Sequence, residues 1–337
     1  MNNIELIFPE IFISLSIMFL LILGVFKKDS SKIIHNISLL VLLITAVITF
    51  NETLSINPTT LFNESIIIDY LSSFMKIITL LAAFVVLLIS SNYLRTFKIF
   101  KIEYPILILS SVLGMMIMIS SNDLIVFYMG LELQSLALYV LATFNRDQLK
   151  SSEAGLKYFV LSALSSGLLL YGCSLIYGFT GSTNFNVIST QFNTNEYAIT
   201  FGIVFILVGL AFKISAVPFH MWAPDVYEGS PTSVTLFFTM VPKIAALTVF
   251  IRFLYVPFLN LIDQWQMILV FLSIASMLFG AIAAIGQKNL KRLIAYSSIS
   301  HIGYALAGLA TGSNEGIQSS VIYLSLIHIS EPTRRVR

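Results

Sequence analysis

The sequence has few charged residues, one cysteine and no clustered histidines, and each shortage excludes a class of protein. Charged residues make up 11% of the 337 positions, against about 25% in an ordinary soluble domain. This excludes a soluble enzyme, a disordered chain and a nucleic-acid binder, whose basic surface needs more Lys and Arg. The single cysteine, Cys173, excludes a disulfide framework and a cysteine-ligated metal or iron–sulfur site. The four histidines lie far apart and show no metal-ligand spacing.

Long apolar segments make up most of the chain instead. Hydrophobic residues account for 57% of the sequence, and the mean hydropathy is +0.90. A helix that crosses the roughly 30 Å hydrocarbon core needs about 20 mostly apolar residues. The runs are apolar on all sides, so they predict membrane-spanning helices rather than the alternating strands of a barrel. We predict an all-α polytopic protein with an eleventh span beginning near Ile317 and ten earlier spans at 4–26, 33–50, 66–90, 104–120, 122–144, 154–178, 198–219, 231–255, 265–287 and 290–310.

Positive charges are confined to alternate connections between these segments. Eleven Lys and Arg lie in the first, third, fifth and ninth loops, and the second, fourth, sixth, eighth and tenth loops contain none. Because Lys and Arg accumulate in cytoplasmic loops, this pattern places the N-terminus outside. The first apolar run lacks a basic leader and a cleavage site, so we expect it to be a retained span. The seventh loop, 220–230, departs from the pattern because it holds Asp225 and Glu228 but no Lys or Arg.

Three ionisable residues lie deep within predicted spans. Glu132 and Lys243 are central in the fifth and eighth spans, and Lys213 is deep in the seventh. A charge at mid-bilayer costs about 2.5–3.5 kcal/mol on insertion scales, so each needs a wet interior or an opposite charge. One acid and two bases at similar depth predict a buried pair with a transferable proton, and the alternative is a static ion pair. Pro218 predicts a break in the seventh helix, as in transporters that expose backbone groups to an ion.

Other polar residues in the spans have both a functional and a structural interpretation. His220 follows the predicted break and titrates near neutrality when unperturbed, yet it can be a packed interfacial side chain. His301 is roughly central in the tenth span among serines, which suit a water wire or helix packing. Lys157 is a candidate for proton transfer or for a local pair with Glu153. Lys76 requires an internal partner.

Several motifs together resemble a known family of membrane subunits. They include GLEL at 130–133, FKISAVPFHMWAPDVYEGSPT at 212–232, VPK at 241–243 and RLIAYSSISHIGY at 292–304. These residues are similar to the antiporter-like subunits of bacterial NADH-quinone oxidoreductase, respiratory complex I, and most of all to its subunit N family. The resemblance covers about residues 4–326. The 213–232 motif is highly specific for the antiporter-like subunits.

This resemblance implies a fold of about fourteen helices with two inverted five-helix repeats, of which 10–11 helices are present. It implies three N-terminal helices in 1–103, a first repeat in 104–255 and a partial second repeat in 256–326. We expect 327–337 to be a non-native tail, because the last span is short and 331–337 has no counterpart in the family. The central lysine of the second repeat is expected beyond residue 337.

The resemblance also implies roles for individual residues. Glu132 and Lys213 would form the pair of the first half-channel, Lys243 the next proton carrier, and His301 a link toward the second half. NADH, FMN, iron–sulfur clusters and quinone would be handled by other subunits, and this chain would bind no cofactor or metal.

We therefore expect a proton-translocating subunit of an inner-membrane respiratory complex, surrounded by lipid and by the other membrane subunits. The N-terminus is expected on the periplasmic side. Two alternatives are a subunit of a multi-subunit cation/proton antiporter with the same repeat and a structural scaffold with static ion pairs.

Overall fold

Long helices make up most of the chain in a computed structural model, which describes residues 5–27, 30–53, 58–191 and 196–330. Its helices coincide with the apolar runs, and eight are long and apolar enough to cross a membrane. Two further apolar helices, at Glu103–Ile119 and Tyr197–Lys213, are shorter. The expected all-α polytopic class is confirmed. The tail positions 331–337 lie outside the described residues.

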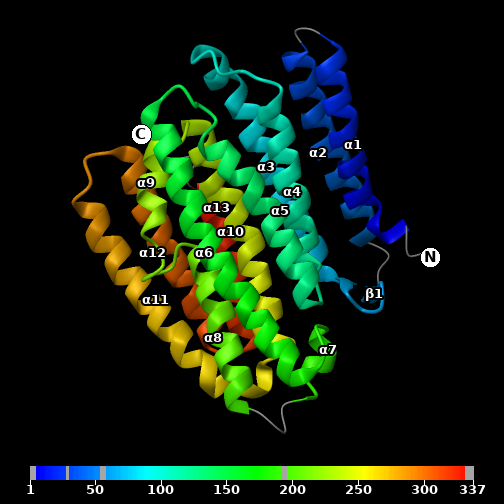
Figure 1. The fold of residues 1–337 in the computed structure, drawn as a ribbon, viewed down its shortest axis with the longest axis vertical. Coiled ribbons are helices and arrows are strands. Elements are labelled where there is room, and N and C mark those ends of the chain that lie inside the picture. Colours follow the sequence, from blue (N-terminus) through cyan, green and yellow to red (C-terminus); the bar gives the residue numbers. More distant parts are fainter. Residues whose placement is uncertain (1–4, 28–29, 54–57, 192–195, 331–337) are drawn as a thin grey trace. The chain divides into compact units, whose positions relative to one another are not determined.

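The chain forms two units, the first comprising residues 1–156 and 229–248. A short 3-10 turn, Glu5–Ile7, precedes its first helix. Figure 1 shows α1 to α5 in blue to green, and the paired helices include α1 with α2 and α4, α2 with α3, and α4 with α5. Its elements are α1 (Phe8–Phe26), α2 (Ser31–Thr53), β1 (Thr59–Leu61), β2 (Ile66–Ile68), α3 (Tyr70–Thr96), α4 (Glu103–Ile119), α5 (Leu124–Ala142), the start of α6 (Leu149–Thr180) and most of α10 (Thr232–Tyr255).

The second unit comprises residues 157–228 and 249–337. Within it α11 packs along α12, and α12 packs against α13. Besides the rest of α6 and α10, its elements are α7 (Phe185–Ile188), α8 (Glu196–Lys213), α9 (Trp222–Gly229), a 3-10 turn (Leu259–Leu261), α11 (Ile262–Ile285), α12 (Leu290–Ala310) and α13 (Asn314–Ser330). The expected boundaries of the inverted repeats stay a prediction.

The third predicted span starts four residues too early. Residues 66–68 form β2, which pairs antiparallel with β1 in the register Thr59 with Ile68. Helix α3 begins at Tyr70 because Asp69 caps it and accepts a hydrogen bond from the Ser72 backbone nitrogen at 2.8 Å. Three isoleucines suit a strand as well as an apolar helix, which is why the hairpin was not predicted.

Helices α4 and α5 approach each other at two glycines. A Cβ added to Gly114 would lie 2.5 Å from the backbone nitrogen of Gln134 and 2.7 Å from the carbonyl oxygen of Gly130. Only a residue without a side chain allows this approach. The contact fixes the position of α5, the helix that carries Glu132.

Replacing Gly114 by Ala should destabilise the protein, because the new methyl group must push α4 and α5 apart. Overpacking of this kind costs about 1–3 kcal/mol. Gly167→Ala in α6 is the matched control, since nothing lies within 4 Å of its added Cβ and Ala favours helix. Thermal unfolding of the purified protein compares both variants with the parent. A midpoint for Gly114→Ala at or above the parental value contradicts the close packing.

Candidate proton-transfer site

The seventh predicted span is interrupted inside the apolar region, as Pro218 predicts. Helix α8 ends at Lys213, and α9 begins only at Trp222. The predicted span ran to residue 219 with a break near Pro218, and the regular helix ends before that break. It ends earlier because Ser215 adopts a left-handed φ of 58° and because proline cannot donate to the preceding turn.

Neighbouring side chains satisfy backbone groups that the interruption leaves unpaired. The Val217 backbone nitrogen donates to Ser276 Oγ of α11 at 2.9 Å. The indole nitrogen of Trp222 donates to the carbonyl oxygen of Phe212 at 2.9 Å. Irregular backbone at membrane depth is tolerated only where protein or water provides such partners. The break is therefore built into the packing of the second unit.

Lys213 is the last residue of α8, and its ammonium group donates to Ser162 Oγ of α6 at 2.7 Å. Ser162 is buried and Lys213 is half-buried. The C-terminal end of a helix carries partial negative charge, so a lysine there is stabilised. A serine hydroxyl accepts from an ammonium and can donate to a neutral amine. This environment is thus compatible with both protonation states of Lys213.

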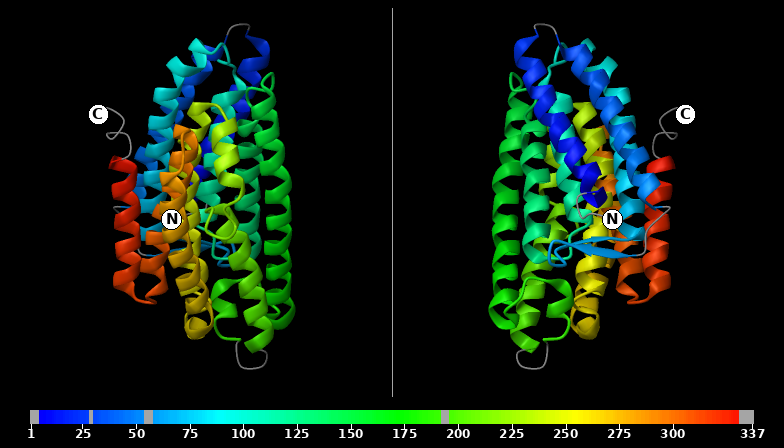
Figure 2. Two further views of the ribbon diagram at one scale, coloured as in Figure 1. Left: turned by 90° about the vertical axis from the view of Figure 1, so that its left-hand side faces the viewer. Right: turned by 90° about the vertical axis from the view of Figure 1, so that its right-hand side faces the viewer.

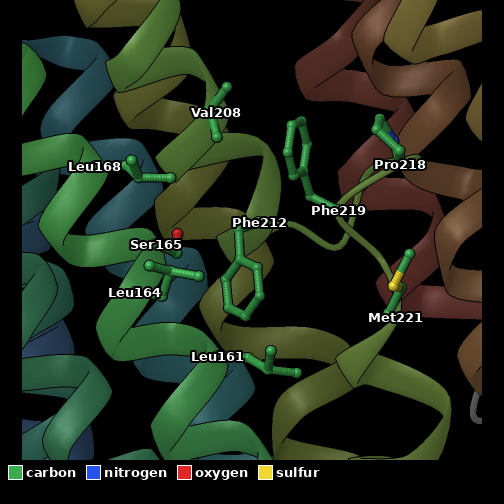
Figure 3. A pocket seen from close by; sticks show the side chains of 9 residues that line it. All are labelled: Leu161, Leu164, Ser165, Leu168, Val208, Phe212, Pro218, Phe219 and Met221. Carbon is green, nitrogen blue, oxygen red and sulfur yellow. The ribbon is translucent and has the colours of Figure 1, made fainter.

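An apolar cavity of about 310 Å³ lies beside this lysine. Figure 3 shows α6 side chains on one side, Val208 and Phe212 of α8 opposite, and residues of the interruption closing the far side. The one polar side chain in its wall is Ser165, whose hydroxyl donates to the carbonyl oxygen of Gly209 at 3.3 Å. Its walls offer almost nothing to hold a chain of water molecules. The lining residues are Leu161, Leu164, Ser165, Leu168, Val208, Phe212, Pro218, Phe219 and Met221.

Lys157 belongs to an ion network that the sequence analysis did not find. It contacts Asp225 of α9 at 3.1 Å, and the expected local pair with Glu153 stays a prediction. Arg292 of α12 contacts Asp225 at 2.9 Å and Glu228 at 3.0 Å. Burial raises the pKa of Asp225, but hydrogen bonds from Lys157 and Arg292 outweigh it, so the pKa lies below its usual value. The network ties α9 to α6 and α12.

The two candidate histidines occupy different environments in the second unit. The ring of His220 packs on Phe279 at 4.5 Å, and its Nδ1 is buried without a hydrogen-bond partner among the described residues. His301 Nδ1 lies 2.8 Å from the hydroxyl of Tyr323 on α13.

Sequence reasoning missed Tyr323 and Ser162, because neither stands in a motif. Serines spaced along an apolar helix were the one available signal for Ser162.

Glu132 and Lys243 lie in the first unit. Glu132 is near the middle of α5, and its Oε1 is buried without a hydrogen-bond partner in the described part of the chain. Lys243 is 6% exposed and follows Pro242 in the middle of α10. Because Glu132 belongs to the first unit and Lys213 to the second, their expected pairing stays a prediction.

Comparisons with known proteins agree with the motifs. A family model described as "NADH:quinone oxidoreductase/Mrp antiporter, TM" matches residues 121–331. NADH-quinone oxidoreductase subunit N of Pelagibacter ubique strain HTCC1062 is 76% identical over 326 residues, which cover 97% of this chain and 69% of that protein. The chain thus spans about two thirds of the length of this curated relative.

Solved structures support the same assignment. Respiratory complex I from Thermus thermophilus contains a chain with 31% identity and a TM-score of 0.80, and the match covers 94% of this chain and 66% of that chain. The Mrp complex from Dietzia sp. DQ12-45-1b matches at 24% identity with a TM-score of 0.86, covering 98% and 63%. The second likeness shows the fold alone. The chain therefore belongs to the NADH:quinone oxidoreductase/Mrp antiporter family, and within it to the subunit N family of NADH-quinone oxidoreductase.

Proposed function

We propose that this chain is a proton-translocating membrane subunit of NADH-quinone oxidoreductase, in which Lys213 takes up and releases a proton at the broken end of α8. The observation that carries the proposal is the position of Lys213, whose ammonium group lies at a helix interruption and on a neutral hydroxyl. A subunit N relative with 76% identity supports the assignment to the complex. NADH, FMN, iron–sulfur clusters and quinone would be bound mainly by other subunits.

The proton would move between ionisable groups whose charges change each other's proton affinity. Two unit charges 4 Å apart interact by about 4 kcal/mol at an effective dielectric near 20, so a shift of Glu132 relative to Lys213 would change the proton affinity of Lys213. Lys243 would be the next carrier, and His301 with its partner Tyr323 would continue the route. The burial of Lys243 in α10 supports its role, because an interior charge without a function is costly.

The orientation of the chain follows from its loop charges. We place the N-terminus on the periplasmic side of the inner membrane, because the first, third, fifth and ninth loops carry the Lys and Arg. Asp225 and Glu228 of the seventh loop then lie on the cytoplasmic side. Their pairing with Arg292 supports this placement, since Arg292 comes from the ninth loop region.

The ion network gives α9 a structural role in this proposal. Helix α9 directly follows the interruption. Fixing α9 against α6 and α12 therefore also fixes the irregular segment between Lys213 and Trp222. Lys157 would then act mainly as an anchor, and its earlier interpretation as a proton carrier becomes secondary. Both interpretations predict a loss of pumping in a Lys157 variant, but only the anchor predicts a loss of stability.

A cation/proton antiporter subunit is the alternative function. The likeness to the Dietzia Mrp complex concerns the fold, which both kinds of protein share. Neighbouring genes separate the two: genes for other complex I subunits support our proposal, and a cluster of antiporter genes supports the alternative.

Lys213→Met should reduce proton pumping coupled to quinone reduction by about 100-fold or more, because a positioned proton-transferring group contributes about 10²- to 10⁴-fold. The complex should still assemble, because methionine fills a similar volume. Lys288→Met is the matched control, since Lys288 is an exposed loop lysine. Membrane vesicles that contain the complex report both pumping and NADH oxidation. Parental pumping in Lys213→Met, at normal turnover, would refute the proposal.

Lys243→Ala should leave an assembled complex with reduced pumping and reduced quinone reduction. The reason is its central position in α10 and its burial at 6% exposure. Assembly is checked by native electrophoresis and function by the proton-to-electron ratio. A normal ratio at full turnover would show that Lys243 is not a carrier.

Asp225→Asn should lower the stability of the complex at neutral pH by about 0.5–1 kcal/mol, a value already reduced for screening at a partly exposed pair. Because the folded pKa of Asp225 is depressed, its contribution is full above about pH 4, the ordinary pKa of aspartate. This contribution to stability disappears as the pH falls through the lower pKa that Asp225 has in the folded state. Thermal unfolding across this pH range should show the difference from the parent shrinking in acid. Asp147→Asn, in an exposed loop, is the control, and a pH-independent difference for Asp225→Asn contradicts the assignment.

A further inference from the structure

Near its middle, helix α6 turns hydroxyl side chains inward and leucine side chains outward. Ser162, Ser165 and Ser166 are buried, at 0%, 4% and 4% exposure, whereas Leu161 and Leu164 of the same turns are 38% and 65% exposed. A buried serine in a membrane-spanning helix either bonds a neighbouring helix or belongs to a path for protons or ions. The contacts of the three serines distinguish these two roles.

Helices α6 and α8 lie side by side in the second unit, and Figure 2 shows both in shades of green. Close contacts fix their register. A Cβ added to Gly172 of α6 would lie 2.7 Å from the carbonyl oxygen of Gly202 of α8, and one added to Gly209 of α8 would lie 2.6 Å from the Cβ of Leu169. Packing this tight does not allow the helices to slide. The end of α8 is therefore held against the turn of α6 that carries Ser162.

Ser165 and Ser162 both bond to α8, but to groups of different kinds. The hydroxyl of Ser165 donates to the carbonyl oxygen of Gly209 at 3.3 Å, which is a contact between helices. Ser162 Oγ accepts from the Lys213 ammonium group at 2.7 Å. A hydroxyl has one donor and two acceptor sites, so it can receive a proton from one neighbour and give its own to another. Ser162 is thus the first atom group that a proton leaving Lys213 meets.

Lys76 of the first unit does not share this neutral partner. The sequence analysis expected an internal partner for it, and its Nζ contacts Glu10 Oε1 at 2.5 Å, with side chains 5% and 10% exposed. Removing the positive charge from such a pair leaves a buried carboxylate uncompensated. The hydroxyl beside Lys213 sets no such condition.

The Ser166 hydroxyl has no packing role in the part of the chain that the structure describes. Its Oγ is buried and has no hydrogen-bond partner there. An unpartnered buried hydroxyl is unfavourable, and such a group usually bonds an ordered water molecule. Ser166 follows Ser162 by four residues, so the two side chains lie on one face of α6 with Cβ atoms about 5–6 Å apart. One water molecule bridges polar groups at such a separation.

This face of α6 is separate from the apolar cavity. Ser166 lies about 100° around the helix from Ser165, which Figure 3 shows in the cavity wall among leucines. It lies still further from the leucines themselves. A proton that passes from Ser162 to Ser166 therefore avoids the cavity, whose walls hold no water. The α6 residues that line the cavity are Leu161, Leu164, Ser165 and Leu168.

The two hydroxyls also define a direction along α6. Lys157, which contacts Asp225 in the ion network, precedes Ser162 by five residues. Ser166 lies one turn beyond Ser162, near the middle of the helix Leu149–Thr180. At about 1.5 Å per residue, the step from Ser162 to Ser166 leads about 6 Å away from the ion network. The step therefore runs from the loop side toward the middle of the membrane.

We propose that Ser162 and Ser166 form a hydroxyl relay, with one water molecule between them, that takes the proton from Lys213 toward the middle of the membrane. The Lys213 N–H bond breaks as an O–H bond forms at Ser162. The earlier hydrogen of Ser162 passes to the water, and a hydrogen of the water passes to Ser166. Ser166 releases its own hydrogen toward the neutral amine of the next carrier, so each oxygen gains and loses one hydrogen.

This inference rests on the function proposed above, because it describes how the proton leaves Lys213. Its test compares valine with threonine at each serine, since the two side chains have nearly the same volume and only threonine keeps a hydroxyl. Ser162→Val and Ser166→Val should each lower proton pumping by about 100-fold, the lower value for a positioned proton-transferring group. Ser162→Thr and Ser166→Thr should pump close to the parental rate. Membrane vesicles that contain the complex report pumping and NADH oxidation together.

Ser165→Val is the matched control and should pump like the parent, since Ser165 bonds a backbone carbonyl and the adjacent cavity accommodates the added methyl groups. Ser166→Ala adds no volume and should also pump less than Ser166→Thr, so the comparison does not depend on how valine is accommodated. Native electrophoresis confirms that each complex is intact.

The outcomes separate the relay from the function on which it rests. Parental pumping in either valine variant, or equal losses in the valine and threonine variants of Ser166, would overturn the relay. If Lys213→Met loses pumping while Ser166→Val keeps it, the relay fails and the proposed function stands. Parental pumping in Lys213→Met would instead refute the proposed function itself.

Discussion

The interior of a bilayer contains no water to bond backbone polar groups, and the whole structure depends on this constraint. The long helices satisfy it by themselves. At residues 214–221 the regular helix stops, and the backbone bonds there are completed partly by turns and partly by side chains, as where Val217 donates to Ser276 of α11. The interruption therefore exists only as part of a packed assembly of helices, and it leaves Lys213 at the negative end of α8.

Lys76 is buried and Lys213 is half-buried, and the two lysines differ in the groups they contact. Lys76 meets a carboxylate at 2.5 Å, so its charge is firmly held. Lys213 donates to a neutral hydroxyl, which accommodates a charged or a neutral amine. The first contact is an ion pair with a carboxylate, and the second is a hydrogen bond to a neutral hydroxyl.

Most predictions from local features agreed with the structure, and most long-range contacts were not predicted. Pro218 predicted an interruption and the apolar runs predicted the helices. The start of α3 was placed too early, because Ile66, Ile67 and Ile68 suit a strand or a helix equally well. The contact of Lys157 with Asp225, 68 residues away, was not predicted.

The sequence by itself determined the fold class, the spans, the break near Pro218 and the presence of Glu132, Lys213 and Lys243 in apolar surroundings. Length of apolar segments and proline chemistry act locally, so they can be read from neighbouring residues. The tertiary structure alone decided the partners: Lys213 with Ser162, 51 residues away, and Lys76 with Glu10, 66 residues away. Helices that are apolar on all sides carry no pattern that shows which face meets which neighbour, and only packing selects it.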